Sequence, residues 1–192
     1  HALAEPTYAL CSRLGVKRYE GVFGMLTGWA RALGSSDAAG VDSMMEALAL
    51  IESMGMLSRM PYWRTLIADG CRVTGRVEEG MRQIEAALEA VERHQERGYL
   101  PLALVTCAEL CRDAERHADG ESHFMQAIQV SQSQGARAFE LRAALGLARM
   151  HAEGGRVDSA VKLLDPLCAS FPNTANSVDL VAARDFLLRH RG

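Results

Sequence analysis

Two cysteines on one predicted helix are the residues best placed for metal chemistry. Cys107 and Cys111 are four residues apart, so a helix places both thiols on one face. Thiolates bind zinc, but a structural zinc site needs four ligands and therefore a second pair from elsewhere in the chain. The alternative is core packing, since free cysteine is among the most buried residue types. The core interpretation is the stronger one, and we expect neither a metal nor another cofactor.

No other arrangement of side chains predicts a catalytic site. A nucleophilic serine or cysteine needs a histidine and a third orienting group, and helical spacing assembles no such triad in this sequence. The sequence also contains no Gly-x-x-x-x-Gly-Lys-Ser/Thr phosphate loop and no His-Glu-x-x-His zinc motif. We therefore expect that the chain is not an enzyme, and an active site hidden in a groove is the least favoured alternative.

Aromatic and charged side chains at recurring helical positions are candidates for binding a peptide or a protein. They are Trp29, Tyr62, Asp69, Arg72, Glu109, Arg112, Arg142 and Arg149. A guanidinium group suits carboxylates because it can bind them through two parallel hydrogen bonds. The alternative for Arg72 and Arg112 is an exposed ion pair with Asp69 or Glu109, which contributes about 0 to 1 kcal/mol.

A repeat of 40 residues determines where these side chains lie. Ala68, Ala108 and Ala148 are 40 residues apart, and Gly28 extends the series backward by the same step. A second small-residue series follows 12 residues after the first, at Gly40, Gly80, Gly120 and Ala160. Four residues later comes a large apolar residue, which is Met44, Ile84, Phe124 or Leu164. Small residues at these positions let two antiparallel helices approach to about 8 to 10 Å, and the large residue fills the space beside them.

The turn between the paired helices is also marked. The predicted turns are residues 34–36, 74–76, 115–116 and 154–156. Three of them contain glycine, at Gly34, Gly75 and Gly155, and glycine adopts a left-handed backbone at little cost. The remaining turn carries Glu115 in place of glycine. Proline opens two of the first helices, at 61 and 101, where its missing N–H is harmless.

These patterns predict an all-α fold, a right-handed α-solenoid of tetratricopeptide-like helix pairs. The standard tetratricopeptide unit has about 34 residues, and a period of about 40 is also found in HEAT and armadillo repeats. The order of small, small, large and alanine positions favours the tetratricopeptide type. We expect one domain over 1–192, with a partial repeat at 1–20, repeats at 21–60, 61–100, 101–140 and 141–180, and a capping helix at 177–190. An isolated half-repeat cannot bury its apolar face, so we expect the parent protein to continue upstream.

Several segments resemble one large bacterial family. They are residues 139–149, Gly155-Arg156, the run from Leu163 to Leu167, the segment 75–80, and Phe171 with Asp179-Leu180 in the closing helix. The family comprises predicted ATPase-type regulators with tetratricopeptide-like C-terminal arrays, fused to adenylate or guanylate cyclase domains or to winged-helix DNA-binding domains. The resemblance implies a sensor or docking arm of such a regulator, with the ATPase and output domains outside this chain. Glu115 and the apolar Pro101, Leu102 and Leu104 depart from the family pattern.

Composition narrows the possible partners and location. With 48% hydrophobic and 23% charged residues, the chain has the composition of an ordinary globular protein. A net charge of -3 provides no broad positive field for nucleic acid. No run of about 18 to 20 apolar residues predicts a membrane span, and five scattered cysteines fit a reducing cytoplasm better than a disulfide scaffold.

The leading hypothesis is therefore a protein- or peptide-binding module of a cytoplasmic signalling or transcriptional regulator. The parent protein's own ATPase domain is one candidate partner. The first alternative is a self-association module that forms a homodimer.

Overall fold

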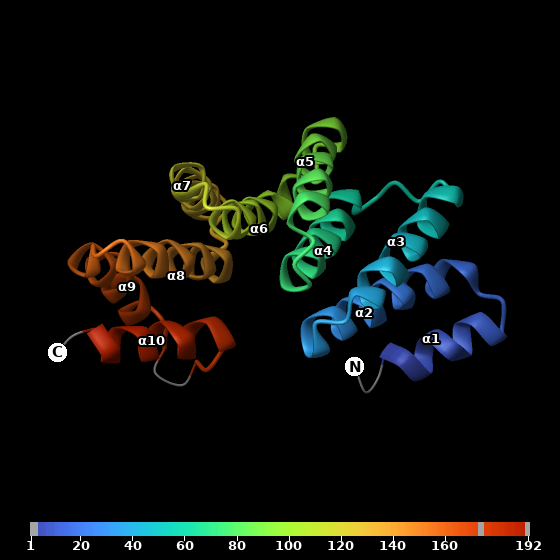
Figure 1. The fold of residues 1–192 in the computed structure, drawn as a ribbon, viewed down its shortest axis with the longest axis horizontal. Helices are drawn as coiled ribbons and strands as arrows, with labels where there is room; N and C mark the ends of the chain where they lie inside the picture. Colours follow the sequence, from blue (N-terminus) through green and yellow to red (C-terminus); the bar gives the residue numbers. More distant parts are fainter. Residues whose placement is uncertain (1–3, 173–174, 191–192) are drawn as a thin grey trace. The chain divides into compact units, whose positions relative to one another are not determined.

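The computed structural model describes residues 4–172 and 175–190, and in these residues the regular secondary structure is entirely helical. In chain order the helices are α1 Ala4–Arg13, α2 Lys17–Ser35, α3 Ala38–Ser53, α4 Met60–Val73, α5 Val77–His94, the 3-10 helix η1 Arg97–Tyr99, α6 Leu100–Asp113, α7 His117–Ser133, α8 Arg137–Glu153, α9 Val157–Ala169 and α10 Val178–His190 (Figure 1). The predicted all-α fold class is thus confirmed. None of the described helices combines the length and the hydropathy that a membrane-spanning helix requires.

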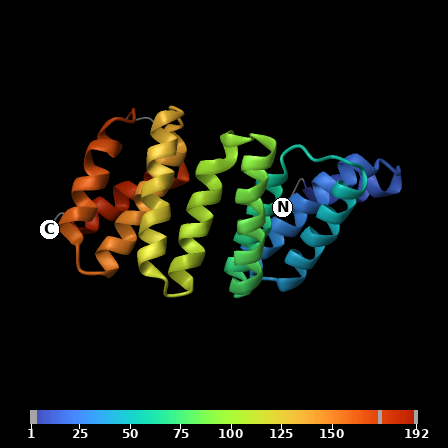
Figure 2. The ribbon, with the colours of Figure 1, turned by 90° about the horizontal axis from the view of Figure 1, so that it is seen from above.

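The helices pack into two compact units, residues 1–99 and 100–192. The first unit contains α1 to α5 with η1, and the second contains α6 to α10. Within each unit, helices that follow one another in the chain lie side by side (Figure 2). Alternate helices also pack, α2 with α4 in the first unit and α6 with α8 and α8 with α10 in the second. The second unit begins at Leu100, one residue before the start expected for the repeat 101–140.

The first helices of the four predicted repeats begin before the predicted starts, two of them by one residue and two by about one turn. α4 and α6 begin at Met60 and Leu100, directly before Pro61 and Pro101. α2 and α8 begin instead at Lys17 and Arg137, four residues before the predicted starts at 21 and 141. Proline blocks extension of a helix at its N-terminal side, because it lacks an N–H and disfavours helical backbone in the preceding residue. No proline stands at the predicted start of α2 or α8, so each helix extends by about one turn.

Small residues lie where paired helices approach most closely, as predicted. A Cβ atom on Gly28 of α2 would lie only 2.5 Å from the carbonyl oxygen of Gly40 on α3. In the second unit, a Cβ atom on Gly120 of α7 would lie 3.1 Å from the carbonyl oxygen of Ala108 on α6. The predicted large residues that follow have exposed fractions of 0%; they are Met44, Ile84, Phe124 and Leu164. Close backbone approach and the large side chain beside it therefore build the core of each helix pair.

The turns between paired helices follow the prediction in three of the four repeats and depart from it in the first. Gly75 and Gly155 have left-handed backbones with φ of 76° and 77°, and Glu115 adopts the same conformation with φ of 58°. The first turn was predicted at residues 34–36, and of these only Ser36 lies outside α2, so the assignment of Gly34 to the turn is wrong. α2 continues through residue 35, and Ser36 takes the left-handed position with φ of 52°. A left-handed residue ends the helix whether or not it is glycine, at a higher cost in conformational energy for serine and glutamate.

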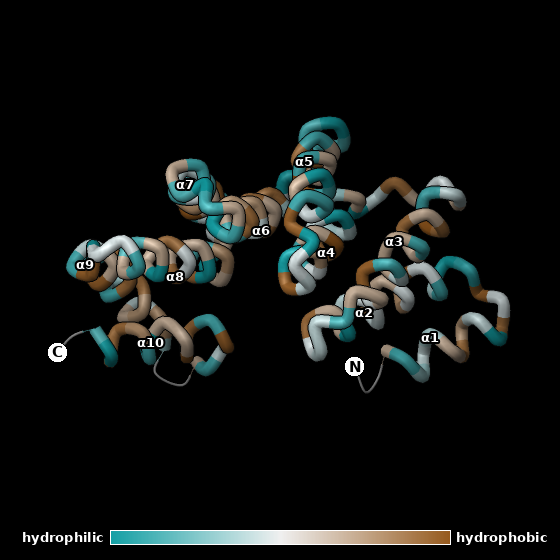
Figure 3. The backbone as a smooth tube through the Cα atoms, in the orientation of Figure 1, coloured by the Kyte–Doolittle hydropathy of each residue, from teal (hydrophilic) through white to brown (hydrophobic). Residues whose placement is uncertain are grey.

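The predicted capping helix is α10, which begins one residue later than the predicted start at 177. The Ser177 hydroxyl accepts a hydrogen bond from the Leu180 backbone N–H at 3.4 Å, as an N-terminal cap does. The buried residues of α10 join the core formed by α8 and α9; they are Leu180, Ala183, Phe186 and Leu187. In Figure 3 the hydrophobic colouring is strong along α6, most of which is buried in the second unit.

Candidate functional site

Three of the predicted site residues meet in the first unit, on α2 and α4. The Trp29 Nε1 donates a hydrogen bond to Asp69 Oδ2 at 3.2 Å. The Arg72 guanidinium lies one turn further along α4, with Nη2 3.4 Å from Asp69 Oδ1. The side chains of Arg72 and Asp69 have exposed fractions of 25% and 26%, and Trp29 packs partly buried against the core. We call this arrangement of Trp29, Asp69 and Arg72 the α2–α4 face.

Tyr62 lies on the same helix as this face, two turns before Asp69. Its ring packs against Trp63, with centroids 5.0 Å apart, and against Tyr99, with centroids 5.4 Å apart. Partial burial raises the pKa of the Tyr62 hydroxyl. Because residues seven apart share one side of a helix, α4 presents an aromatic group and a charged group along one side.

In the second unit, α6 carries the corresponding charged pair at Glu109 and Arg112. The Arg112 Nη2 lies 2.7 Å from Glu109 Oε2 and 3.7 Å from Asp113 Oδ1. The ion pairs that the sequence analysis considered as the alternative role for Arg72 and Arg112 are thus present in both units. Partly exposed pairs of this kind contribute about 0 to 1 kcal/mol, so a competing carboxylate from a ligand can displace them at little cost.

The other two predicted arginines lie beside α10. The Arg142 Nε donates a hydrogen bond to Asp179 Oδ2 at 2.9 Å, so this side chain ties α8 to the capping helix. Arg149 lies at a pocket of about 430 Å³ between α8 and α10. The other lining residues are Ala152, Glu153, Ala182, Phe186, Arg189 and His190. The sequence analysis did not single out Arg189 or His190, because α10 was predicted only as a cap.

A second pocket lies between α1, α2 and α3 and was not predicted. Its volume is about 310 Å³, close to the lower end of the range for ligand sites. Three carboxylates line it, from Glu5, Glu20 and Glu46, together with Tyr8 and Thr27. The pocket could not be predicted from the repeat, because residues 1–20 were assigned only as a partial repeat and the pocket depends on how α1 packs against α2 and α3.

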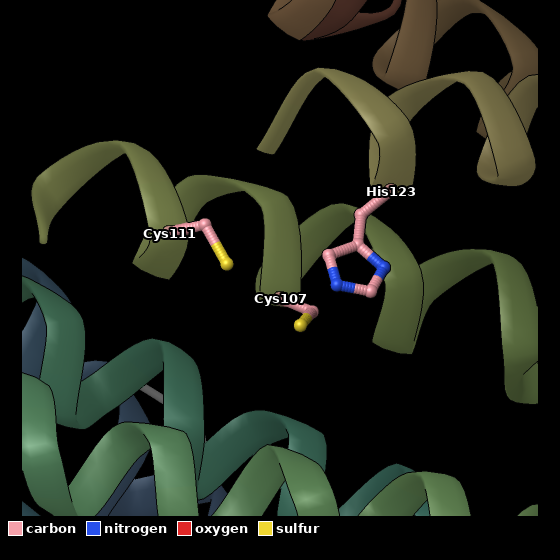
Figure 4. Close-up of side chains that lie close together, drawn as sticks. All are labelled: Cys107, Cys111 and His123. Carbon is pink, nitrogen blue, oxygen red and sulfur yellow. The ribbon is translucent and has the colours of Figure 1, made fainter. Parts of the chain in front are cut away.

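α6 and α7 bring a histidine to the predicted cysteine pair. The Sγ atoms of Cys107 and Cys111 and a ring nitrogen of His123 all lie within 4.8 Å of one another (Figure 4). Both thiols are buried, as the core interpretation predicted, and His123 is partly buried. Burial raises the pKa of the Cys111 thiol and lowers the pKa of His123. The repeat could not have revealed His123, because the residues at the same position are Ser43, Gln83 and Leu163.

A third unpredicted cluster joins α7, α8 and the turn before α9. The Arg156 guanidinium donates two hydrogen bonds to the Glu121 carboxylate, at 3.0 Å and 2.7 Å. The His151 Nε2 lies 3.1 Å from Glu121 Oε1. The hydrogen bonds from Arg156 are the largest cause of a lowered Glu121 pKa, which is about 2. In the first unit, Arg76 in the turn before α5 makes a similar contact, with its Nη1 2.6 Å from Asp42 Oδ1 on α3. Arg76 and Arg156 therefore each connect one helix pair to the preceding pair.

Replacing Glu121 by glutamine is expected to lower the free energy of unfolding by about 1 kcal/mol at pH 7, because the bidentate ion pair is lost. Since the folded pKa lies below the ordinary value of 4.5, the contribution is present above about pH 4.5 and is lost as the pH falls toward 2. Urea denaturation of both proteins at several pH values measures the difference. Glu85→Gln, at an exposed position on α5, is the control for charge alone. If the difference in free energy of unfolding between the wild type and Glu121→Gln stays constant down to pH 2, the ion pair between Glu121 and Arg156 does not stabilise the fold.

The predicted site residues therefore form separate local groups. Trp29, Asp69 and Arg72 are in contact, Tyr62 lies on the same side of α4, and Glu109 pairs with Arg112. Arg142 and Arg149 each lie beside α10. In comparisons with known proteins, the chain matches no protein-family model and no curated protein.

Proposed function

We propose that this chain is a protein- or peptide-binding helical-repeat module, with no catalytic activity of its own, in a multidomain bacterial regulator. The side-by-side packing of alternate helices, α2 with α4, α6 with α8 and α8 with α10, supports a right-handed solenoid of tetratricopeptide-like pairs. In such arrays the first helices of successive pairs line the binding surface. The resemblance to ATPase-type regulators supports the role of a sensor or docking arm.

The observation that carries the proposal is the α2–α4 face. Tryptophan, tyrosine and arginine are the residues that contribute most often to binding energy at protein interfaces. Here Trp29 and Arg72 converge on Asp69 from two helices, with Tyr62 further along α4. The face therefore suits a segment that presents a carboxylate close to an apolar side chain. The carboxylate replaces Asp69 as the partner of Arg72, and the apolar group packs beside the aromatic rings.

Converting both Arg72 and Arg112 to glutamate is expected to abolish this binding while changing the melting temperature little, because each arginine is partly exposed and a partly exposed ion pair contributes only about 0 to 1 kcal/mol. Peptides are first selected from a random display library with the wild-type chain as bait. Their affinities for both proteins are then measured by fluorescence anisotropy. We expect selected peptides to be rich in Asp or Glu beside an apolar residue and to bind the variant at least tenfold more weakly.

The control variant makes the same charge change elsewhere, at Arg93 on α5 and Arg116 before α7, both exposed. It should retain the wild-type affinity. If the peptides bind the Arg72→Glu/Arg112→Glu protein as tightly as they bind the wild type, the binding surface lies elsewhere.

Self-association is the second candidate function, and the outer side of α10 favours it. Val178, Val181 and Leu188 have exposed fractions of 85%, 44% and 75%, and their spacing of three and seven residues places them on one side of the helix. Sedimentation of the wild type and of Leu188→Glu distinguishes the two functions. A concentration-dependent dimer that the variant loses would favour self-association through α10.

A further inference from the structure

We propose that Cys107, Cys111 and His123 bind a thiophilic divalent metal ion, of which Zn²⁺ is the representative. This site lies within the second unit and is independent of the peptide-binding proposal. In the described part of the chain, it is the one group of at least three His, Cys, Asp or Glu side chains with ligand atoms within 4.8 Å of one another. α6 supplies both thiols, one turn apart, and α7 supplies the imidazole (Figure 4).

The imidazole of His123 turns its Nε2 atom toward the two sulfur atoms (Figure 4). The Sγ atoms are weak hydrogen-bonding groups, whereas a metal ion held by both sulfurs would also accept the lone pair of Nε2. The other ring nitrogen, Nδ1, is buried, has no hydrogen-bond partner among the described residues and lies on the far side of the ring from the sulfurs.

The ligand geometry fits a tetrahedral ion after small side-chain movements. With Zn–S of about 2.3 Å and Zn–N of about 2.0 to 2.1 Å, ligand atoms in a tetrahedral site are roughly 3.5 to 3.8 Å apart. The observed limit of 4.8 Å exceeds this separation by about 1 Å, which rotation of the cysteine and histidine side chains can close. Three protein ligands leave the fourth position for water or for a group from a bound partner.

The charges favour a divalent ion over Cu⁺. Two thiolates and a neutral imidazole around Zn²⁺ make a site with no net charge, whereas the same ligands around Cu⁺ leave one negative charge. Cys107 and Cys111 have exposed fractions of 4% and 0%, and burying an uncompensated charge in such surroundings is costly. Each thiol releases its proton to solvent when the metal–sulfur bond forms. The bound ion would tie α6 to α7, which are otherwise joined by packing and a short turn.

The test is a titration of the reduced, metal-free full chain with Co²⁺ and then with Zn²⁺. We expect one ion per chain, with thiolate-to-cobalt charge-transfer absorption in the near ultraviolet that Zn²⁺ abolishes. Cys107→Ala and His123→Gln should each weaken Zn²⁺ binding at least tenfold. His123 is only partly buried, so His123→Gln should remain folded even if the loss of Cys107 disturbs the core, and circular dichroism checks this.

Cys71→Ala is the matched control. Cys71 is buried on α4 at the same repeat position as Cys111, but it belongs to no such group of possible metal ligands in the described chain. The control should retain wild-type Zn²⁺ affinity and the Co²⁺ absorption. The proposal is wrong if the wild type binds no stoichiometric ion at micromolar concentrations. It is equally wrong if His123→Gln binds Zn²⁺ as tightly as the wild type, or if Cys71→Ala loses the site.

Discussion

Replacing Ala108 by phenylalanine is expected to lower the free energy of unfolding by more than about 3 kcal/mol. Ala108 is fully buried on α6, at the point where α6 passes α7. A Cβ atom at Gly120 of α7 would lie 3.1 Å from the Ala108 carbonyl oxygen and 2.9 Å from Met150 Cε. The space beside this crossing is already filled, so a phenyl ring enters only if the two helices separate.

Urea denaturation followed by circular dichroism at 222 nm, about the wavelength of the helical minimum, measures the effect. The control is Ala118→Phe, which adds the same atoms at an exposed position on α7. Its expected cost is about 0.5 kcal/mol or less, from helix propensity alone. Equal effects for the two variants would show that residue 108 does not lie at the helix crossing. The 40-residue repeat would then place the wrong residues at the crossings.

Replacing Gly28 by alanine is expected to destabilise the first unit by about 2 kcal/mol, although alanine is the better helix former. The added Cβ atom would lie 2.5 Å from the Gly40 carbonyl oxygen and 2.6 Å from Met44 Cγ. Met44 is fully buried, and the oxygen belongs to the backbone of α3. Neither neighbour can move far without separating α2 from α3, so the clash outweighs the gain in helix propensity.

Gly34→Ala, on the same helix, is expected to change the stability in the opposite direction from Gly28→Ala. Gly34 is exposed, and a Cβ atom added there meets no atom within 4 Å. The substitution should therefore stabilise the protein by about 0.5 kcal/mol, through the lower conformational entropy of alanine in the unfolded chain. The same denaturation experiment measures both variants. The close packing of α2 on α3 would be refuted if Gly28→Ala were as stable as Gly34→Ala.

The sequence alone determined the helices and the contacts within each helix pair. Apolar residues with spacings of three and four predicted the helices, and Gly28, Gly40 and Ala108 marked where their backbones approach. Asp69 with Arg72 and Glu109 with Arg112 are three residues apart on one helix. All of these features depend on the helical period and on local backbone preferences. Gly34 was assigned wrongly because several residues near a helix end can take the left-handed position.

Only the tertiary structure decided which side chains from different helices meet. His123 lies beside Cys107 and Cys111, Arg142 pairs with Asp179, and Arg156 pairs with Glu121. Each of these contacts depends on how far one helix is rotated and shifted against another. That setting is determined by the volumes and shapes of many packed side chains together. It leaves no periodic pattern in the sequence, and this is why the repeat predicted the helix pairs but not the histidine beside the thiols.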